Sequence, residues 1–233
     1  MERTKYRLYQ NVCRTRPALL FFTGWSPSII AFNPVQFHAR RLAKQLNISC
    51  MVVFFRGMGS PGNIKALTRQ DFLDDAVGSY DNLIQYQNVD PNNVYVIGES
   101  FGSYIASVLT SIRKIKGIIL RVPTDFPNDG FIDTPQIQIA GMKSIEWKRR
   151  YHSSDESFAL KAISNYSDGI FIVSSGKDTF VPESTINNYL KCCSNNDDVN
   201  HSIMKKSGHG LLKLSEQKEY YRLIYSWLEP RIK

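Results

Sequence analysis

The sequence predicts an α/β fold with a mostly parallel central sheet and helices on both faces. Short apolar, strand-like runs alternate with helix-like segments along most of the chain, which is the pattern of such sheets. The apolar fraction of 42% is that of a globular protein. A length of 233 residues suits one α/β domain with a substantial core. We therefore expect residues 1–233 to form a single domain.

The first elements follow from apolar runs. Residues 18–22 are predicted to form the first clear buried strand, with an edge strand near residues 6–9 before it. A helix over residues 35–46 follows, and the apolar run at 50–55 predicts the next strand. That strand ends in a loop punctuated by glycines at residues 56–62.

A helix, a turn and a strand come next. Residues 71–86 carry apolar side chains on one helical stripe, and acidic residues near their start suit the positive end of the helix dipole. Proline and asparagine within residues 89–93 predict a turn, because they disfavour continuation of either element. Residues 94–97 then predict a buried strand, and the apolar spacing over 103–112 predicts a helix.

The second half repeats the alternation with one interruption. Apolar runs predict buried strands at residues 115–120 and 169–173 and a last strand at 202–204, and an amphipathic helix over 216–228 closes the chain. Residues 123–165 break the pattern with prolines, aspartates and glycines, followed by a polar, helix-like stretch. The segment follows the carboxyl end of the predicted strand at 115–120, and ligands bind at the carboxyl ends of parallel strands. We therefore interpret 123–165 as a short cap-like insertion within the domain.

The most informative motif is Gly98-Glu99-Ser100-Phe101-Gly102, between a buried strand and a helix. Glycines two residues before and two after the serine permit a sharply bent backbone and close packing of strand and helix. Such a turn exposes one hydroxyl where a base can reach it. The pattern alone is weak, but the strand before it and the helix after it supply the context that it needs. Ser100 is therefore the predicted nucleophile.

A serine hydroxyl needs a base, and the base needs a group that orients it. Asp178 lies in the loop after the strand at 169–173, on the same edge of the predicted sheet as the serine. His209 follows the last strand, and its flanking residues Gly208 and Gly210 permit the loop to bring the imidazole over the serine. The order serine, aspartate, histidine is the one expected for this architecture.

Other histidines and aspartates fit these roles less well. His38 falls in an early helix, His152 in the cap, and His201 before the last strand, at the wrong end of the sheet. Residues 197–198 lie beyond the next helix and are interpreted as an exposed turn. The structural alternative for Asp178 is a turn-forming cap, a role that aspartate often has.

These segments resemble the α/β-hydrolase fold serine hydrolases, and the resemblance extends over essentially the whole chain. It is carried by the serine motif at 98–102, by Gly-Lys-Asp-Thr-Phe-Val-Pro at 176–182 and by the Gly-His pair at 208–209. Within the family the chain is most similar to the small esterase/thioesterase and dipeptidyl-peptidase-related branch. The resemblance implies an α/β-hydrolase fold, with Ser100 as nucleophile and His209 as general base. It implies that Asp178 is the partner of that base.

Acyl transfer also needs donors for the developing oxyanion. The backbone N–H of Phe101, at the start of the helix after the serine, is one that the motif itself supplies. In the family the second donor comes from the loop after the first buried strand, usually through a His-Gly pair and the residue after it. That loop is Thr23-Gly24-Trp25-Ser26, so the resemblance implies the Trp25 amide, with threonine in place of the usual histidine.

Several apolar side chains are candidates for an acyl pocket, although each is equally compatible with packing. The predicted substrate contacts are Trp25, Met58, Phe126 and Phe180. Phe101 and Phe131 are further aromatic candidates.

Composition limits the partners and the compartment. The net charge is +8, but the basic residues are scattered and no stripe of them alternates with stacking aromatics, so no nucleic-acid binding is expected. A solvated surface is the favoured interpretation, and contact with an anionic lipid, an acyl carrier or an acidic partner is the alternative. No apolar signal segment or transmembrane segment is predicted, and the cysteine spacing gives no disulfide framework or zinc site. We expect a cytoplasmic protein without a metal or other cofactor.

The sequence thus predicts a serine hydrolase that cleaves a carboxylic ester or thioester of a small or acyl substrate through an acyl-enzyme on Ser100. A peptidase is the second enzymatic hypothesis, but Ser103 stands where the related peptidases usually carry glycine. An acyl transferase of the same fold is a third. A binding protein without turnover is the non-enzymatic alternative, for which Thr23 leaves room.

Overall fold

The computed structural model describes residues 5–10, 14–25, 33–58, 63–139 and 142–232. Ser26, Cys13 and the end of the predicted glycine loop, residues 59–62, lie outside these residues. The other cysteines, Cys50, Cys192 and Cys193, are free thiols.

The described strands form one sheet in the order β1-β3-β2-β4-β5-β6-β7. Strands β2 to β7 run parallel to their neighbours, and β1 pairs antiparallel with β3 at one edge. Their bounds are β1 Lys5–Tyr9, β2 Arg16–Phe22, β3 Ser49–Phe54, β4 Val89–Glu99, β5 Gly117–Arg121, β6 Gly169–Ser175 and β7 Val199–Met204. This mainly parallel sheet confirms the predicted fold class.

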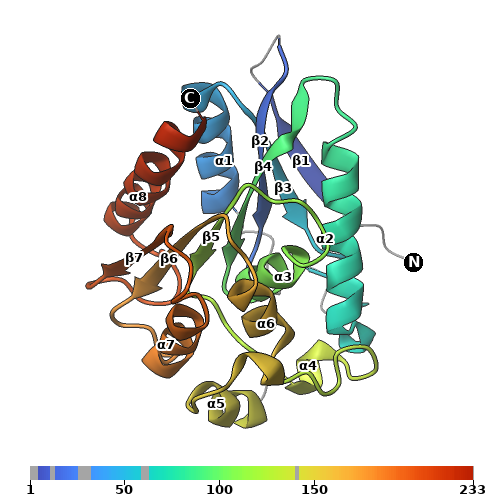
Figure 1. The fold of residues 1–233 in the computed structure, drawn as a ribbon, viewed down its shortest axis with the longest axis vertical. Coiled ribbons are helices and arrows are strands. Elements are labelled where there is room, and N and C mark those ends of the chain that lie inside the picture. Colours follow the sequence, from blue (N-terminus) through green and yellow to red (C-terminus); the bar gives the residue numbers. More distant parts are fainter. Residues whose placement is uncertain (1–4, 11–13, 26–32, 59–62, 140–141, 233) are drawn as a thin grey trace.

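Helices cover both faces of this sheet (Figure 1). Helices α1 and α8 share one apolar core with the sheet, and α2, α3, α6 and α7 share the other. The bounds are α1 Asn33–Leu46, α2 Arg69–Leu83, α3 Phe101–Leu109, α4 Gln136–Ile139, α5 Met142–Lys148, α6 Phe158–Ser164, α7 Glu183–Cys192 and α8 Leu214–Ile232, with 3₁₀ turns η2 Asn63–Ala66 and η3 Ser154–Glu156.

Local sequence explains where individual helices begin. The side chain of Thr68 accepts a hydrogen bond from the Asp71 amide, and the Asp71 carboxylate accepts one from the Thr68 amide. This capping box satisfies backbone donors at the start of α2 that have no partner within the helix. Helix α3 begins directly after Ser100, at the tight turn that the glycines predict.

Two predictions about local structure are wrong. Residues 89–93, predicted as a turn, belong to β4, because Val89 and Val94 both pair with β2 and the residues between them form an irregularity in the register. Asp90 accepts a hydrogen bond from the Asn92 amide at 2.9 Å, a local contact typical of turns that forms here within the strand. Helix α3 ends at Leu109, three residues earlier than the predicted 112.

The segment between β5 and β6 contains α4, η3, α5 and α6, which lie together in the lower part of Figure 1. Helix α6 packs against α3, and the buried guanidinium of Arg69 in α2 donates hydrogen bonds to the carbonyls of Pro127 and Asp129. The start of this segment is therefore fastened to the sheet's helical layer. No helix in the described ranges has both the length and the apolarity required to cross a membrane.

Candidate active site at the carboxyl edge of the sheet

The loops after the parallel strands meet at one edge of the sheet. Thr23 follows β2, Ser100 follows β4, Asp178 follows β6 and His209 follows β7. Because β2 to β7 run in the same direction, all four residues lie at the carboxyl edge, where open α/β sheets bind ligands.

Ser100 lies at the apex of a strained turn. Its φ of 52° and ψ of −115° are conformations that a residue with a side chain rarely adopts. Its amide donates a hydrogen bond to the carbonyl of Arg121 at 2.9 Å, which ties the turn to β5. A Cβ on Gly98 would lie 2.5 Å from the Gly102 carbonyl oxygen, and one on Gly102 would overlap the carbonyl of Phe22. Both glycines are therefore required by the close approach of β2, β4 and α3.

The structure brings the three predicted polar residues together. His209 Nε2 lies 2.9 Å from Ser100 Oγ, and His209 Nδ1 lies 2.9 Å from Asp178 Oδ2. These three side chains come from segments up to 109 residues apart in the sequence. The arrangement has the geometry in which a histidine accepts a proton from a serine while a carboxylate orients the ring.

The Asp178 side chain is 4% exposed and well supplied with donors. Its Oδ1 accepts hydrogen bonds from the amides of Phe180 at 2.8 Å and Val181 at 2.9 Å. Burial raises the pKa of the carboxyl, but the hydrogen bonds from His209 and from the two amides outweigh burial and hold the pKa below its ordinary value. Asp178 is therefore an anion at neutral pH, as a partner for an imidazolium requires.

Ser100 and His209 line a cavity of about 420 Å³ on the side of the sheet that α1 and α8 cover. The described residues around it are Thr23, Gly24, Trp25, Pro34, Val35, His38, Glu99, Ser100, Arg121, His209, Gly210, Leu211, Leu212 and Gln217. Three of these, His38, Glu99 and Arg121, are charged or titratable side chains that the sequence analysis did not assign to the site. His38 lies in an early helix as predicted, α1, but it also lines the cavity of the serine, which the prediction did not include.

Burial changes the ionisation of two of these groups. Burial, and secondarily the charges of Arg41 and Arg121, lowers the pKa of His38 to about 4, so this ring is neutral at pH 7. Burial raises the pKa of Glu99, against the opposing effect of the Arg121 and His209 charges. The cavity next to Ser100 thus contains a neutral imidazole, a carboxyl with a raised pKa and a guanidinium.

Arg121 connects the loops that carry the three residues. Its carbonyl accepts the Ser100 amide, and its Nη2 lies 3.4 Å from the Gly208 carbonyl oxygen and 3.5 Å from Ser175 Oγ. Its Nε has no hydrogen-bond partner within the described part of the chain. The next residue, Val122, has a φ of 40°, which is rare for a β-branched residue. Backbone strain at this edge is therefore not confined to the serine.

Residues 50–233 match the sequence profile of the Prolyl oligopeptidase family. The chain belongs to this family. It is therefore a serine hydrolase of the α/β-hydrolase fold, and the matched range contains Ser100, Asp178 and His209 but not Trp25. No curated protein sequence matches the chain significantly.

Solved structures with the same fold include both esterases and a peptidase. Est1E from Butyrivibrio proteoclasticus is 12% identical with a TM-score of 0.72, over 98% of this chain and 94% of its own. Esterase 2 from Thermogutta terrifontis is 17% identical with a TM-score of 0.69, over 97% of this chain and 88% of its own. Acylaminoacyl peptidase from Pyrococcus horikoshii is 16% identical with a TM-score of 0.70, over 99% of this chain and only 39% of its own. These similarities establish the α/β-hydrolase fold predicted for this family member.

The predicted substrate contacts lie in different places. Trp25 lines the cavity beside Ser100, with its ring 5.5 Å from that of Phe101. Met58 and Phe126 are buried in the core on the α2 and α3 side of the sheet. Phe180 is 67% exposed, and its ring centroid lies 5.2 Å from that of His209. Of the further aromatic candidates, Phe101 and Phe131 are both buried in that same core.

Two further histidines, His152 and His201, do not line the cavity at Ser100. His201 lies within β7, not before it, and its Nε2 is 2.9 Å from Ser174 Oγ. His152 lies in the segment between β5 and β6, stacked on Trp147. Among the described residues, no three His, Cys, Asp or Glu side chains form a cluster that could hold a metal ion.

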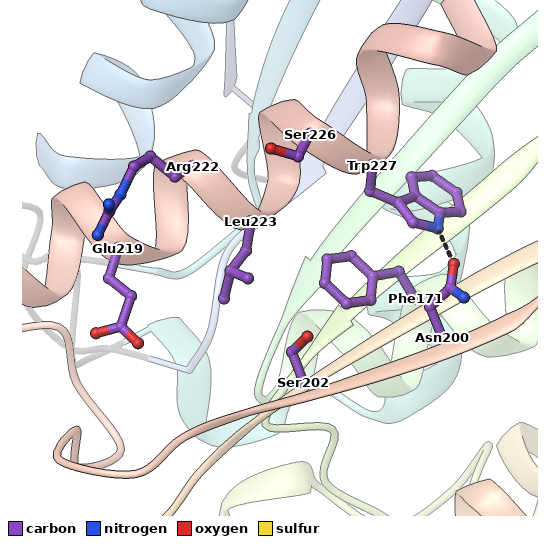
Figure 2. Close-up of a pocket in the computed structure, with 8 residues that line it drawn as sticks. All are labelled: Phe171, Asn200, Ser202, Glu219, Arg222, Leu223, Ser226 and Trp227. Atoms are coloured by element: carbon purple, nitrogen blue, oxygen red, sulfur yellow. Dashed lines mark hydrogen bonds between the residues drawn. The ribbon is translucent and has the colours of Figure 1, made fainter.

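A second hollow lies between α8 and the edge strand β7 and contains none of the three residues at the serine site (Figure 2). It measures about 450 Å³, and Trp227 Nε1 donates a hydrogen bond to Asn200 Oδ1 at its wall. Phe171, Leu223 and Ser202 also face this hollow in Figure 2. Because it has no nucleophile and base in hydrogen-bond contact, the cavity at Ser100 is the better candidate for an active site.

Proposed function

We propose that the protein hydrolyses a carboxylic ester or thioester through an acyl-enzyme on Ser100. The observation that carries this proposal is the continuous hydrogen-bond chain from Ser100 through His209 to Asp178, at 2.9 Å for each link. Membership of the Prolyl oligopeptidase family supports serine chemistry at this site.

In the first step, His209 acts as the general base. Because Nδ1 keeps its proton and donates a hydrogen bond to Asp178, Nε2 is free to accept the proton of Ser100 as the serine oxygen attacks the carbonyl carbon. The imidazolium that forms is stabilised by the Asp178 carboxylate, which stays ionised because its pKa lies below the ordinary value. The same imidazolium then gives its proton to the departing alcohol or thiol.

Two backbone amides are proposed as the oxyanion donors. The Phe101 amide is the first of α3, where the helix leaves its initial N–H groups without partners. The loop of Trp25 lies against the turn at Ser100, since a Cβ on Gly24 would be 3.3 Å from Ser100 Cβ. The Trp25 amide is therefore the candidate for the second donor. Thr23, in place of the family's usual histidine, is fully buried.

A water molecule then completes the cycle by attacking the acyl-enzyme, with His209 as base for the second time. Trp25 is the proposed apolar contact for the acyl group, and Phe180 contacts the substrate at the exposed side of His209. Met58 and Phe126 pack in the core and do not contact the substrate directly in this proposal. Residues 123–165 act as the proposed cap over the site.

Ester cleavage is preferred over peptide cleavage because of one residue beside the serine motif. Ser103 takes the place that glycine usually has in the related peptidases. Its hydroxyl is buried and donates a hydrogen bond to the Gly98 carbonyl at 2.6 Å, so it stabilises the turn at Ser100.

The test is a panel of nitrophenyl esters of graded acyl length, with one thioester and one aminoacyl amide at matched concentrations. We expect turnover of esters or of the thioester, and kcat/KM for the amide at least 100-fold lower. Preferential cleavage of the amide would reassign the protein as a peptidase. Transfer of the acyl group to an added alcohol in preference to water would reassign the protein as an acyl transferase.

A further inference from the structure

Large apolar side chains are exposed around the mouth of the catalytic cavity. Leu212 lines the cavity and is 90% exposed, and Leu214 at the start of α8 is 63% exposed. Phe180, which is 67% exposed, packs beside the ring of His209. A single exposed apolar side chain is ordinary, but several on the segments that follow β6 and β7 form the kind of patch that binds a partner.

Exposed lysines lie on the same two loops as these apolar side chains. They are Lys177, Lys205, Lys206 and Lys213. None of the ion pairs found between described residues includes any of these four. We call the three apolar side chains and the four lysines the catalytic rim.

The acidic groups close to the catalytic rim in sequence do not neutralise it. The Asp178 side chain is buried against His209, and the buried Glu216 accepts a hydrogen bond from the Lys213 amide. Glu183, at the start of α7, is the exposed carboxylate that follows Phe180 along the chain. The catalytic rim therefore carries a net positive charge.

Hydrogen bonds hold the parts of the catalytic rim together. The Gly176 amide donates to the Met204 carbonyl and the Lys177 amide to the Ser207 carbonyl, both at 3.0 Å. The loop after β6 and the loop after β7 are thus fastened side by side. Their lysines lie on the same edge as Leu212, whose amide donates to the Gly210 carbonyl at 3.0 Å.

We propose that the catalytic rim docks on a membrane surface containing anionic phospholipid, and that the substrate is an ester drawn from that surface. Aliphatic side chains enter the boundary between headgroups and acyl chains, while lysines contact the phosphates. In this orientation the cavity mouth faces the lipid, and an ester reaches Ser100 past Leu211 and Leu212. The identity of the substrate rests on the proposed function, whereas the docking does not.

A lipid surface fits the catalytic rim better than a soluble acidic protein does. The positive charge alone suits either partner. The exposed Leu212 and Leu214, however, flank Lys213 in sequence, so apolar and basic groups alternate over a few residues. This alternation suits a surface that presents phosphates and hydrocarbon at nearly the same depth.

The test measures co-sedimentation of the Ser100→Ala protein with vesicles, so that binding is read without turnover. We expect binding to vesicles of phosphatidylcholine mixed with phosphatidylglycerol, weak binding to phosphatidylcholine alone, and loss of binding at high salt. Lys205→Gln with Lys206→Gln should weaken binding roughly 25-fold, at about fivefold for each lysine removed from an anionic surface.

Matched controls lie before β5, at the opposite edge of the sheet. Lys114→Gln with Lys116→Gln removes the same charge there and should leave vesicle binding within about twofold, because those lysines do not reach the lipid. Leu214→Asp should abolish the binding that remains at moderate salt. Ile112→Asp, at a side chain 42% exposed beside the control lysines, should not.

Three results would overturn the docking proposal. They are no binding to anionic vesicles, equal loss in the rim and control variants, and binding that depends on the lysines but not on Leu214. The last result would indicate contact through charge alone, as an acidic protein would also make, without insertion of aliphatic side chains. Hydrolysis of a short, soluble ester by the wild type separates the two proposals. Soluble turnover without vesicle binding contradicts only the docking, and vesicle binding without any ester turnover contradicts the proposed function.

Discussion

The serine turn and the histidine loop reach the same hydrogen bond by different means. The turn follows the central strand β4, carries a φ of 52° at Ser100 and has no space for a Cβ at Gly98 or Gly102. The loop follows the edge strand β7, and a Cβ on Gly208 would meet nothing closer than 3.7 Å. The nucleophile is thus oriented by packing, and the base by its hydrogen bond to Asp178.

Removing the nucleophile is the strongest way to test this comparison. Ser100→Ala should lower kcat for an ester by about 10⁶-fold, which is the loss seen when a serine hydrolase loses its nucleophile. The thermal unfolding midpoint should stay close to that of the wild type or rise, because the turn's backbone strain does not depend on the hydroxyl. Substantial residual turnover would place the nucleophile elsewhere.

Removing the hydrogen bond that orients the base should come next in size. Asp178→Asn keeps the shape of the side chain but favours the wrong tautomer of His209, and kcat should fall by about 10⁴-fold. The amides of Phe180 and Val181 can still donate to the Asn carbonyl oxygen, so the loop should keep its conformation. A fall of less than tenfold would show that packing, and not Asp178, orients the histidine.

A pair of glycine substitutions separates the two regions by stability. Gly102→Ala should lower the free energy of unfolding by about 3 kcal/mol, because its Cβ meets the backbone of β2. Gly208→Ala should change it by less than about 0.5 kcal/mol, since the added methyl finds ordinary contact distances. Urea unfolding of both variants at neutral pH makes the comparison, and equal effects would contradict it.

The smallest expected effect concerns His38, on the side of the cavity that leads to α8. Its pKa of about 4 lies below the ordinary 6.5, so the unfolded chain takes up this proton first as the pH falls. Stability should therefore decrease between pH 6.5 and pH 4, by about 2 kcal/mol between pH 7 and pH 5. His38→Gln should flatten that part of the pH dependence in urea unfolding. An unchanged pH dependence would show that this ring titrates normally in the folded state.

The sequence predicted the parts of the fold that depend on local patterns. The strand before Ser100, the helix after it and the order of the three polar residues are all visible in short segments. The prediction of a turn at residues 89–93 is wrong because pairing with β2 overrides local turn propensity, and no short segment reveals that pairing. The glycines around Ser100 could be read correctly because they report a close approach of backbones.

The charged and titratable residues that line the cavity beside Ser100 could not be predicted. Glu99 and Arg121 lie side by side because they are register partners on β4 and β5, and register is a property of the assembled sheet. His38 was assigned to a helix without a role, since nothing local shows that α1 covers the cavity. The one available signal was that Glu99 lies next to the nucleophile in the motif itself.

The most direct test of the account is covalent labelling of the wild-type protein by a fluorophosphonate, with the modified residue located by peptide mass spectrometry. We predict one phosphonyl group per chain, attached to Ser100, with labelling slowed by at least 100-fold in His209→Gln. Absence of labelling, attachment to another residue, or an unchanged rate without the imidazole would contradict the claim that Ser100 is activated by His209.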